Sequence, residues 1–390
     1  MGFAPPSNAY LSQASLSRPE VSYPLRVWVC NKCWLVQTEE YATAQELFSS
    51  NYAYFSSTSS SWLTHSKNYT DYVVSYLGLT SKSFVLEIGS NDGYLLKNFA
   101  DLSIPCLGIE PTDSTADMAE SRGIPVKRAF FCQDVAQDLA YSGKKADLII
   151  GNNVYAHVPD LNDFTRGLKT ALKADGTITL EFPHLFQLIK NHQFDTVYHE
   201  HFSYLSLTTV NTIFSAHGLT VWRVDEIPTH GGSLRIYGSH EKSRRRVLSS
   251  VNSVLEKERR AGMLSVDLYT NFQKTIDRKK DALLSFLLRQ KKQNKRVVGY
   301  GAAAKGNTLL NYAGVKPDLL AFVCDAAAAK QGLFLPGSHI PVVTPDTLLK
   351  SKPDFVLILP WNLREELTRH LSSKFFIERF VTVIPQLKIT

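Results

Sequence analysis

The stretch V-L-E-I-G-S-N-D-G at residues 85–93 decides the fold of this chain. Its apolar start is typical of a short buried strand, and Gly89 and Gly93 allow a sharp turn against which a ligand can lie. Residues 94–99 can then begin a helix, whose first N–H groups and partial positive charge favour polar ligands. Glu87, at the carboxyl end of the strand, can hold an ammonium or a hydroxyl group. The spacing E-x-G-x-x-x-G differs from the G-x-G-x-x-G of dinucleotide folds, and alone it also fits an ordinary strand–turn–helix.

Strands and helices alternate around this stretch, from residue 83 to 240, which predicts a parallel sheet covered on both faces. The segment 105–111 is predicted as the second strand and ends in Glu110, about 20 residues beyond the glycine turn, where carboxylates of nucleotide-binding α/β folds reach ribose hydroxyls. The alternative is a surface acid, and the glycine turn favours the ribose contact. Further strands are predicted at 146–153 and 176–183, with a helix over 160–173.

Polar side chains follow the strand predicted at 146–153. Asn152 and Asn153 end it, and His157 comes shortly after. Ligands of open α/β sheets bind at the carboxyl ends of the strands. We therefore expect these three residues to converge with Glu110 above the sheet.

The segment F-D-T-V-Y-H-E-H-F-S-Y at 194–204 concentrates proton-transfer chemistry. In an extended loop, Tyr198 and Glu200 would point to one side and His199 and His201 to the other. Histidine is suited to take a proton near neutral pH, and Glu200 could orient it or act beside it. A metal site is the alternative, but H-E-H lacks the spacing of the H-E-x-x-H zinc helix. The segment therefore favours acid–base catalysis over metal binding.

Two more glycine-rich segments could approach a phosphorylated ligand. T-H-G-G-S-L-R at 229–235 follows a strand predicted over 219–227, and Arg235 could meet a phosphate, although a glycine hairpin with a surface Arg is the alternative. G-Y-G-A-A-A-K-G-N at 299–307 carries Lys305 and suits phosphate oxygens, yet it is neither a P-loop nor a full dinucleotide fingerprint. It opens a second strand–helix alternation with strands predicted at 296–301, 319–324, 355–359 and 380–384.

The composition is that of a globular protein with two or three domains: 390 residues, 44% hydrophobic and 20% charged. No apolar run reaches the roughly 18 residues of a membrane span, and residues 1–20 lack the pattern of a signal peptide. We therefore expect a cytoplasmic protein that does not bind membranes. The five cysteines form no disulfide framework.

The net charge of +7 is unevenly distributed, because residues 241–300 hold 16 Lys and Arg against 6 Asp and Glu. Such a segment could face nucleic acid, a phosphorylated substrate or solvent. Apolar residues recur along it, and no nucleic-acid motif accompanies it. We predict amphipathic helices with solvated basic faces and no nucleic-acid partner.

The N-terminal part carries a C-x-x-C turn formed by Cys30 and Cys33. Two thiolates on a tight turn can supply half of a tetrahedral zinc site, but no second C-x-x-C is present, so a thiol-bearing or vestigial turn is favoured. Residues 46–82 combine a tyrosine-rich loop with a helix predicted at about 61–77. The loop could pack on the surface or cover the pocket at residue 89 as a lid.

The chain resembles the sugar C-methyltransferases, class I enzymes that use S-adenosylmethionine (SAM) and act on nucleotide-linked 4-keto-deoxysugars. The resemblance spans nearly the whole chain and rests on eight segments: Y-P-L and C-x-x-C-W-L-V-Q at 23–37, V-L-E-I-G-S-N-D-G at 85–93, G-I-E-P-T at 108–112, N-N-V-x-A-H-V-P-D at 152–160, E-F-P-H at 181–184, Y-H-E-H-F-S-Y-L-S at 198–206, T-H-G-G-S-L-R at 229–235 and Y-G-A-A-A-K-G-N-T-L-L-N at 300–311.

The resemblance implies an α/β architecture of several parts. A partial zinc-binding segment and lid would occupy residues 1–75, and a SAM-binding domain with a doubly wound sheet residues 76–240. A basic helical connector over 241–292 would lead to a Rossmann-like domain over 293–390 that helps to hold the nucleotide sugar. The family's zinc site uses two cysteine pairs, whereas this chain has only Cys30 and Cys33, so we expect either a shortened start or loss of the metal.

The resemblance also implies roles for individual residues. Tyr198, Glu200 and His201 match the catalytic segment, with His201 as the base, and His157 and Tyr52 match positions that line the sugar pocket. The implied SAM site consists of Glu87, Gly89, Asn91, Gly93, Glu110, Asn152 and Asn153. We assign substrate contacts to His184, His230, Arg235, Gly301, Lys305 and Asn307.

The implied reaction is methylation of a keto-sugar carbon, expected at C3, by a monomer or small homo-oligomer. The first alternative is a SAM-dependent O- or N-methyltransferase. A nicotinamide-dependent oxidoreductase using residues 299–306 is disfavoured by the turn's spacing and by the lack of an obvious acid after the next strand. The third alternative is a non-catalytic scaffold that binds nucleic acid through residues 241–296.

Overall fold

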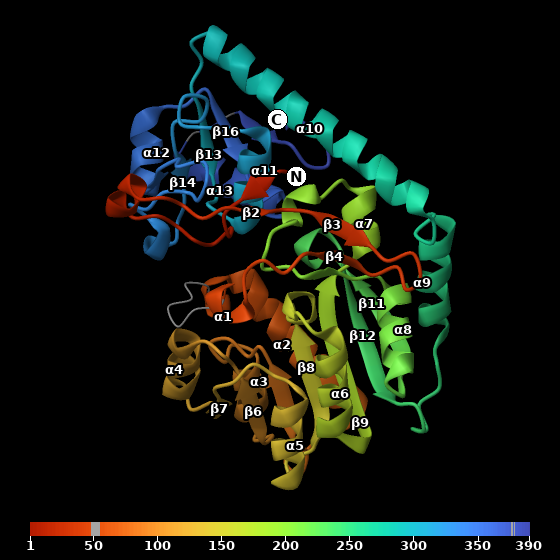
Figure 1. Cartoon of the computed structure of the whole chain (residues 1–390). Helices are drawn as coiled ribbons and strands as arrows, with labels where there is room; N and C mark the ends of the chain where they lie inside the picture. Colours follow the sequence, from red (N-terminus) through yellow and green to blue (C-terminus); the bar gives the residue numbers. More distant parts are fainter. Residues whose placement is uncertain (48–54, 376, 378) are drawn as a thin grey trace.

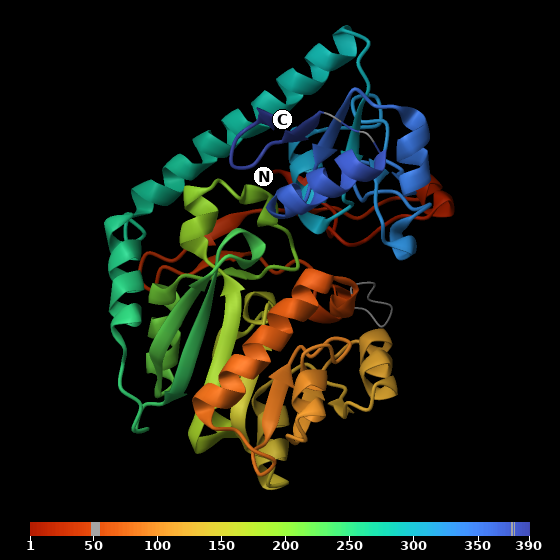
Figure 2. The ribbon, with the colours of Figure 1, turned by 180° about the vertical axis from the view of Figure 1, so that it is seen from behind.

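The computed structural model describes residues 1–47, 55–375, 377 and 379–390. They form two α/β lobes, and a long helix runs along the edge of the molecule from one lobe to the other (Figure 1). The N-terminal segment crosses both lobes, as the view from behind also shows (Figure 2). The predicted α/β class with a second C-terminal sheet is confirmed.

The larger lobe is built on a seven-stranded sheet in the order β11-β12-β9-β8-β5-β6-β7. Six strands run in the same direction, and β12 is antiparallel to its neighbours β9 and β11. The first of these strands along the sequence, β5, lies in the middle of the sheet, and later strands are added on both sides of it. Ligands are therefore expected at the carboxyl edge beside β5. The strands are β5 (Val85–Ile88), β6 (Cys106–Ile109), β7 (Val126–Lys127), β8 (Ala146–Asn152), β9 (Leu172–Pro183), β11 (Leu219–Ile227) and β12 (Ser233–His240).

Helices cover both faces of this sheet because its central strands are apolar on both sides. Val85 points to one core with α2 (Ser60–Leu77), α3 (Leu96–Asp101) and α4 (Asp113–Ser121). Its neighbour Leu86 points to the other core with α5 (Gln133–Tyr141), α6 (Leu161–Ala171) and α8 (Leu207–Ala216). A short helix, α7 (Leu185–Lys190), follows β9.

The smaller lobe has a six-stranded sheet in the order β15-β14-β13-β16-β17-β18, with only β18 antiparallel. Its strands are β13 (Val297–Tyr300), β14 (Val323–Cys324), β15 (Val342–Val343), β16 (Phe355–Ile358), β17 (Phe380–Thr382) and β18 (Lys388–Ile389), and its helices are α11 (Ala304–Ala313), α12 (Pro345–Ser351) and α13 (Arg364–Phe375). The strand predicted at 319–324 is shorter, because the N–H groups of Leu319 and Leu320 both donate to the carbonyl of Lys316 in a turn.

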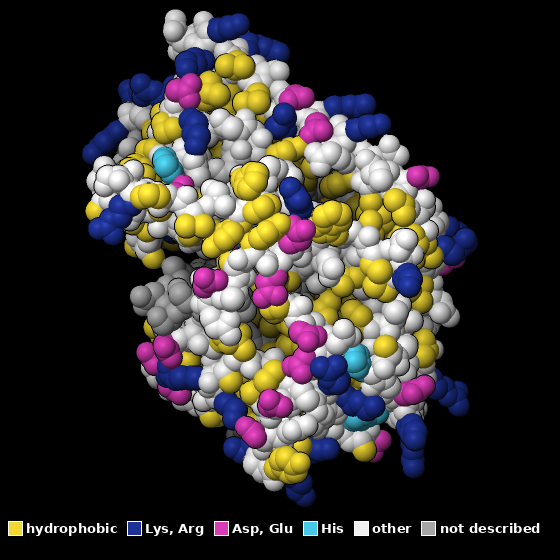
Figure 3. Space-filling view, in the orientation of Figure 1, with side chains coloured by type: hydrophobic (Ala, Val, Ile, Leu, Met, Phe, Trp, Pro, Cys, Tyr) yellow, Lys and Arg dark blue, Asp and Glu magenta, His cyan; other side chains and the backbone are white. Residues whose placement is uncertain are grey.

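The basic segment after β12 divides into α9 (Ser249–Arg260) and α10 (Val266–Lys292). Val251 and Val254 of α9 are buried against the larger sheet, whereas Leu283 and Leu287 of α10 are buried in the smaller lobe. The two helices therefore pack against different lobes. On the face shown in Figure 3, Lys and Arg side chains along α10 are interspersed with acidic ones rather than gathered in one patch.

The N-terminal segment adds two small antiparallel sheets: β1 (Phe3–Ala4) with β2 (Tyr23–Pro24), and β3 (Val27–Val29) with β4 (Val36–Thr38) and β10 (Ser203–Tyr204). A single-turn helix, α1 (Ala44–Leu47), follows. The 3-10 helices are η1 (Gln13–Ser17), η2 (Ser56–Thr58), η3 (Tyr155–His157), η4 (Phe194–Thr196), η5 (Thr229–Gly231), η6 (Ala328–Lys330) and η7 (Trp361–Leu363). Among the residues that the structure describes, no helix has the length and apolar character needed to cross a membrane.

Candidate active site

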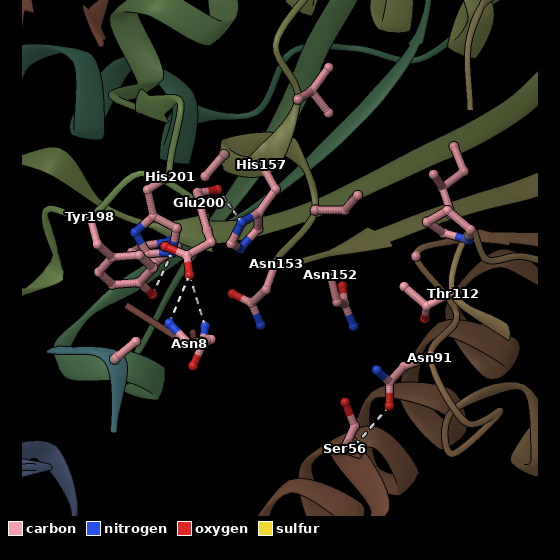
Figure 4. Close-up of a pocket in the computed structure, with 18 of the residues that line it drawn as sticks. Asn8, Ser56, Asn91, Thr112, Asn152, Asn153, His157, Tyr198, Glu200 and His201 are labelled. Atoms are coloured by element: carbon pink, nitrogen blue, oxygen red, sulfur yellow. Dashed lines mark hydrogen bonds between the residues drawn. The ribbon is translucent and has the colours of Figure 1, made fainter. Parts of the chain in front are cut away.

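A cavity of about 760 Å³ lies at the carboxyl edge of the larger sheet and is closed by residues of the smaller lobe. Its lining combines the turn after β5, the ends of β6 and β8, the segment at 196–201, and the start of α11. Figure 4 draws the side chains of this lining, among them Asn91, Asn152 and His201. The structure thus brings the predicted SAM residues and the predicted catalytic segment into one space.

The turn after β5 has backbone angles that explain its composition. Gly89 has φ +68°, and a Cβ there would lie 3.2 Å from Cγ2 of Val154. Asn91 has φ +49°, and its side-chain Oδ1 accepts a hydrogen bond from the Ser56 N–H at 2.8 Å. Only glycine adopts the first conformation without strain, and asparagine tolerates the second. The turn is thereby joined to the segment that precedes α2.

Glu110 follows β6, as predicted, and lines the cavity. Its Oε2 accepts the Asn91 N–H at 2.8 Å, and its Oε1 accepts the N–H and the hydroxyl of Thr112 at 3.0 and 2.5 Å. The carboxylate therefore has a fixed orientation beside the glycine turn. This geometry is compatible with a ribose contact.

Two predicted SAM residues do not reach the cavity. Glu87 is 1% exposed and does not line it, and burial, with the nearby charges of Glu110 and Asp92, raises its pKa well above the usual range. Gly93 has φ +74°, and a Cβ there would lie 3.1 Å from atoms of Ala119 and Ile124. Burial thus favours the protonated form of Glu87, and the close packing around Gly93 favours a glycine at that position.

Asn152 and Asn153 line the cavity at the end of β8. Neither Oδ1 nor Nδ2 of Asn152 has a hydrogen-bond partner among the described residues, although both atoms are buried. Asn153 has φ +53°, and its Nδ2 lies 3.4 Å from Nε2 of His230, which also lines the cavity. Because buried amides are normally paired, the side chain of Asn152 indicates a polar ligand in this part of the cavity.

Apolar residues of the cavity lining were missed by the sequence analysis. They are Trp62 of α2 and, after β7, Phe130, Phe131 and Cys132. A flat aromatic ligand group could lie against the section formed by Phe130 and Phe131. The signal that could have indicated these residues is the pair of phenylalanines after the third strand of the alternation.

The Y-H-E-H segment forms a turn rather than an extended loop, so the predicted alternation of its side chains is wrong. The His201 N–H donates to the Tyr198 carbonyl at 3.0 Å, which brings both side chains to the same side. The Nδ1–H of His201 donates to the Thr196 carbonyl at 2.8 Å, so Nε2 is the unprotonated nitrogen and accepts the Tyr198 hydroxyl, also at 2.8 Å. His199 lies elsewhere, against Tyr23 and the carbonyl of Pro24.

His157 completes a pair of neutral histidines. Its Nδ1–H donates to the Glu200 carbonyl at 2.6 Å, and its ring lies edge-on to that of His201 with centroids 4.6 Å apart. Burial lowers the pKa of His157 to about 4, and burial together with His157 places the pKa of His201 well below the usual range. Burial likewise lowers the pKa of His230 to about 4. At neutral pH these rings are proton acceptors.

Glu200 lines the cavity and is 2% exposed. Its Oε1 accepts hydrogen bonds from the backbone N–H and the side-chain Nδ2 of Asn8, at 3.1 and 3.2 Å. Asn8 also lines the cavity, and the sequence analysis missed it because nothing in its neighbourhood suggested a site. The two residues are 192 positions apart in the chain.

The smaller lobe presents positive charge to the cavity through Lys305 and Lys330. The Nζ of Lys305 donates to Oδ1 of Asn362 at 3.0 Å and lies 4.7 Å from the centre of the Trp361 ring. Gly301 and Asn307, assigned to the substrate, do not line the cavity. A Cβ on Gly301 would meet Pro360, and Asn307 donates its Nδ2 to the Ser7 carbonyl at 2.6 Å, so both have structural contacts instead.

An acid does follow the second strand of the smaller lobe, contrary to the sequence analysis. Asp325 comes directly after β14, and its two carboxylate oxygens accept the N–H groups of Ala302 and Ala327 at 2.7 and 2.8 Å. The carboxylate therefore braces the glycine-rich turn after β13.

His184 and Arg235 are assigned to the substrate but lie outside this cavity. The Nε2 of His184 lies 2.7 Å from Oε1 of Glu258 on α9, and both side chains are buried. Arg235 donates to Oε2 of Glu181 at 2.8 Å, which makes it a buried ion pair instead of a phosphate contact. In each case the partner is a carboxylate far away in the sequence, Glu258 for the ring of His184 and Glu181 for the guanidinium of Arg235.

The remaining predicted site residues are Cys30, Cys33 and Tyr52, all in the N-terminal part of the chain. Cys30 and Cys33 sit on a tight turn in which the Trp34 N–H donates to the Cys30 carbonyl. No group of three or more His, Cys, Asp or Glu that could hold a metal occurs among residues 1–47, 55–375, 377 and 379–390. Tyr52 lies outside the described residues, so its predicted place in the sugar pocket stays a prediction.

Comparison with known proteins shows matches along the whole chain. Three family models match: "Putative zinc binding domain" over residues 1–48, "Methyltransferase domain" over 65–224 and "C-methyltransferase C-terminal domain" over 228–385. The C-methyltransferase NovU of Streptomyces niveus is 34% identical over 373 residues, which cover 95% of this chain and 88% of that protein.

Solved structures match about half of the chain with low sequence identity. PH0226 of Pyrococcus horikoshii OT3 is 14% identical and covers 48% of this chain and 95% of its own, with a TM-score of 0.40. YcgJ of Bacillus subtilis is 15% identical and covers 46% of this chain and 100% of its own, with a TM-score of 0.38.

Proposed function

The chain belongs to the C-methyltransferase family, and from this premise we propose that it methylates C3 of a nucleotide-linked 4-keto-deoxysugar. It is a SAM-dependent methyltransferase. The observation that carries the proposal is the shared cavity, in which the neutral ring of His201 faces the same space as the turn at Gly89 and the amide of Asn152, which has no partner among the described residues.

The residues of the larger lobe fit SAM. A Cβ on Gly89 would fill the space against Val154, so the backbone there is kept open for close approach. Glu110 can accept ribose hydroxyls, the amide of Asn152 lacks a partner among the described residues, and the section around Phe131 suits an adenine ring. When bound, SAM would supply an electrophilic methyl group.

The catalytic segment fits deprotonation next to a ketone. The ketone at C4 of the sugar acidifies the proton on C3, and Nε2 of His201 takes that proton while the electron pair moves toward the ketone oxygen. Bound SAM would then supply its methyl group to C3, with the thioether as the leaving group. The Tyr198 hydroxyl donates to Nε2 at 2.8 Å in this structure, so it must turn away from that nitrogen when the substrate binds, and it can then donate to the developing oxyanion.

The smaller lobe supports the choice of a nucleotide-linked substrate. Lys305 and Lys330 bring two cations to a cavity whose other charged lining residues are acidic, within the described part of the chain. The N-terminus of α11 begins beside Lys305 and adds oriented N–H groups. A diphosphate bridging a nucleoside and a sugar would be complementary to this side of the cavity.

Two measurements test the proposal. Isothermal titration should show micromolar binding of SAM to the wild type and at least tenfold weaker binding to Glu110→Ala, with Glu120→Ala, an exposed carboxylate outside the cavity, as the control that binds like wild type. Incubation of wild type with ¹³C-methyl SAM and a panel of nucleoside-diphosphate 4-keto-deoxysugars should give a product whose methyl carbon couples to sugar carbon C3 in NMR.

A methyl signal attached to oxygen or nitrogen would support the O- or N-methyltransferase alternative. Binding of SAM without transfer to any sugar in the panel would contradict the proposed substrate, and absence of SAM binding would favour a scaffold. Cytoplasmic location and a monomeric or small homo-oligomeric state stay predictions.

A further inference from the structure

The first segment of the chain closes one side of the cavity. The carbonyl of Ser7 accepts Nδ2 of Asn307, the Tyr10 hydroxyl donates to the Ala302 carbonyl at 2.5 Å, and Leu11 pairs with Phe334. All three partners belong to the smaller lobe, so residues 7–11 are fixed to it. Residues 7–11 lie within the match to the zinc-binding family model, yet Asn8 lines the active-site cavity.

Asn8 extends from this segment to Glu200 of the catalytic turn. Figure 4 shows its two nitrogens directed at one carboxylate oxygen, and both distances, 3.1 and 3.2 Å, are to Oε1. A backbone N–H and a side-chain amide of one residue thus bind the same oxygen, which fixes the position of Oε1. Asn8 thereby links the smaller lobe to the catalytic segment of the larger lobe.

The other oxygen of Glu200 is left for a ligand. Oε2 is buried and has no hydrogen-bond partner among the described residues, and Glu200 lines the cavity. A buried carboxylate oxygen without a donor is costly unless something supplies one. Because Asn8 binds Oε1, Oε2 is the oxygen of Glu200 that has no donor among the described residues.

We propose that Asn8 is a positioning residue of the active site, which orients Glu200 so that Oε2 accepts a hydrogen bond from a hydroxyl group of the substrate. The N-terminal segment then contributes to the active site, in addition to preceding the turn that carries Cys30 and Cys33. The identity of the substrate rests on the proposed function, whereas the contact of Asn8 with Glu200 does not.

The charge state of Glu200 depends on this contact. Burial raises its pKa, and the hydrogen bonds from the backbone, Asn8 and Ser7 oppose that rise. Among the titratable groups around it, burial raises the pKa of Tyr10 and of Tyr204, and lowers that of His157 to about 4 and that of His201. The cations that line the same cavity are Lys305 and Lys330, and both are unchanged in the variants below. Loss of the Asn8 side-chain donor should therefore raise the pKa of Glu200 further, although the backbone N–H of residue 8 remains.

Carboxyl-carbon NMR of protein with ¹³C-labelled glutamate side chains tests this without any substrate. Comparison with Glu200→Gln assigns the Glu200 signal, which is then titrated in wild type, Asn8→Ala and Asn8→Asp. We expect the midpoint to rise by about one pH unit in Asn8→Ala, since a hydrogen bond to a charged group contributes at least that much, and by more in Asn8→Asp, which adds a like charge.

Ser12→Ala is the matched control, because Ser12 is exposed on the same segment and caps η1 without touching Glu200. Its Glu200 midpoint should equal that of wild type. Unchanged midpoints in both Asn8 variants, with near-ultraviolet circular dichroism like that of wild type, would overturn the proposal. If Asn8→Ala does not fold, the isosteric Asn8→Asp decides the question.

Turnover provides a second readout that separates positioning from folding. With the 4-keto-sugar that wild type methylates, the acid limb of kcat/KM should move to higher pH in Asn8→Ala, while SAM affinity stays that of wild type. A fall in activity with an unchanged pH profile would indicate a structural role and contradict the proposal. If wild type methylates no keto-sugar, the proposed substrate fails while the NMR result still decides the role of Asn8.

Discussion

The hydroxyl of Tyr198 lies 2.8 Å from Nε2 of His201, while Nδ1 of the same ring donates to the Thr196 carbonyl at 2.8 Å. The ring is thus held at both nitrogens, in the tautomer that can take a proton at Nε2. In the proposed mechanism the substrate approaches Nε2, which is the nitrogen that the Tyr198 hydroxyl contacts in this structure.

Substitutions at these two residues should differ in severity. His201→Asn should lower kcat about a thousandfold, the usual scale for a general base, and Tyr198→Phe about tenfold, the scale of one lost neutral hydrogen bond. Methyl transfer from labelled SAM measures both, and SAM affinity should stay that of wild type. Equal losses in the two variants would show instead that the Tyr198 oxygen itself takes the proton.

The glycine turn can be tested with a matched pair of glycines. Gly89 and Gly78 both have φ +68°, but a Cβ on Gly89 would meet Val154 at 3.2 Å, whereas one on Gly78 would meet nothing within 4 Å. Gly78→Ala should cost about 1 kcal/mol of unfolding free energy from backbone strain alone. Gly89→Ala should cost more and should weaken SAM binding at least tenfold in titration calorimetry. Unchanged SAM binding in Gly89→Ala would contradict the assignment of this turn.

Two half-buried histidines, His157 and His230, predict how stability depends on pH. The pKa values of His157 and His230 are about 4 in the folded protein, against 6.5 for an unperturbed ring. The unfolded chain binds protons first as the pH falls, so stability is lost between pH 6.5 and about 4, by about 3 kcal/mol for each ring. Asp195, whose pKa burial raises to about 6, acts in the opposite direction between pH 6 and 3.8.

Urea unfolding at pH 7 and pH 5 measures this effect. The loss of unfolding free energy between the two pH values should be smaller in His157→Asn and in His230→Asn than in wild type. Comparison of each variant with wild type isolates the histidine, because Asp195 and the other carboxyl groups are common to both. An equal loss in all three proteins would contradict the prediction.

Glu258 should be essential for stability but not for SAM binding. It is buried on α9, accepts the N–H groups of Leu207 and Thr208 at 2.7 and 2.9 Å, and lies 2.7 Å from Nε2 of His184. Glu258→Gln should lower the free energy of unfolding by about 2–4 kcal/mol, because a buried charged network loses a partner.

Glu256→Gln is the control on the same helix, since its ion pairs with Arg259 and Arg260 are exposed. It should change the unfolding free energy by less than about 0.5 kcal/mol. Similar losses in the two variants, measured by urea unfolding, would show that α9 does not depend on the buried contact.

The backbone of the site could be predicted from local sequence. Residues 85–93 predicted the strand and the turn, Glu110 was placed at the end of the second strand, and Asn152 at the end of β8, all as the structure has them. These features depend on short-range physics: glycine permits positive φ, and apolar runs form buried strands. The same reasoning predicted α2 within one residue.

Side-chain partners could not be predicted in the same way. Arg235 was expected to bind phosphate, but Glu181 of a neighbouring strand is its partner, and His184 is engaged by Glu258, 74 residues away. Both sites looked available in the sequence because their partners are distant along the chain. The alternation predicted for Tyr198 and His201 failed for a different reason, since a local turn replaced the extended backbone.

By itself the sequence determined two α/β lobes, a ligand-binding turn after β5 and a proton-transfer segment around His201, because periodicity, glycine and side-chain chemistry act over a few residues. Only the tertiary structure decided that Asn8 reaches Glu200 across 192 positions and that two lysines of the smaller lobe face the same cavity. Those contacts exist because the lobes dock with the N-terminal segment between them. No local pattern encodes which distant surfaces meet, since that depends on how the buried faces of the whole chain fit together.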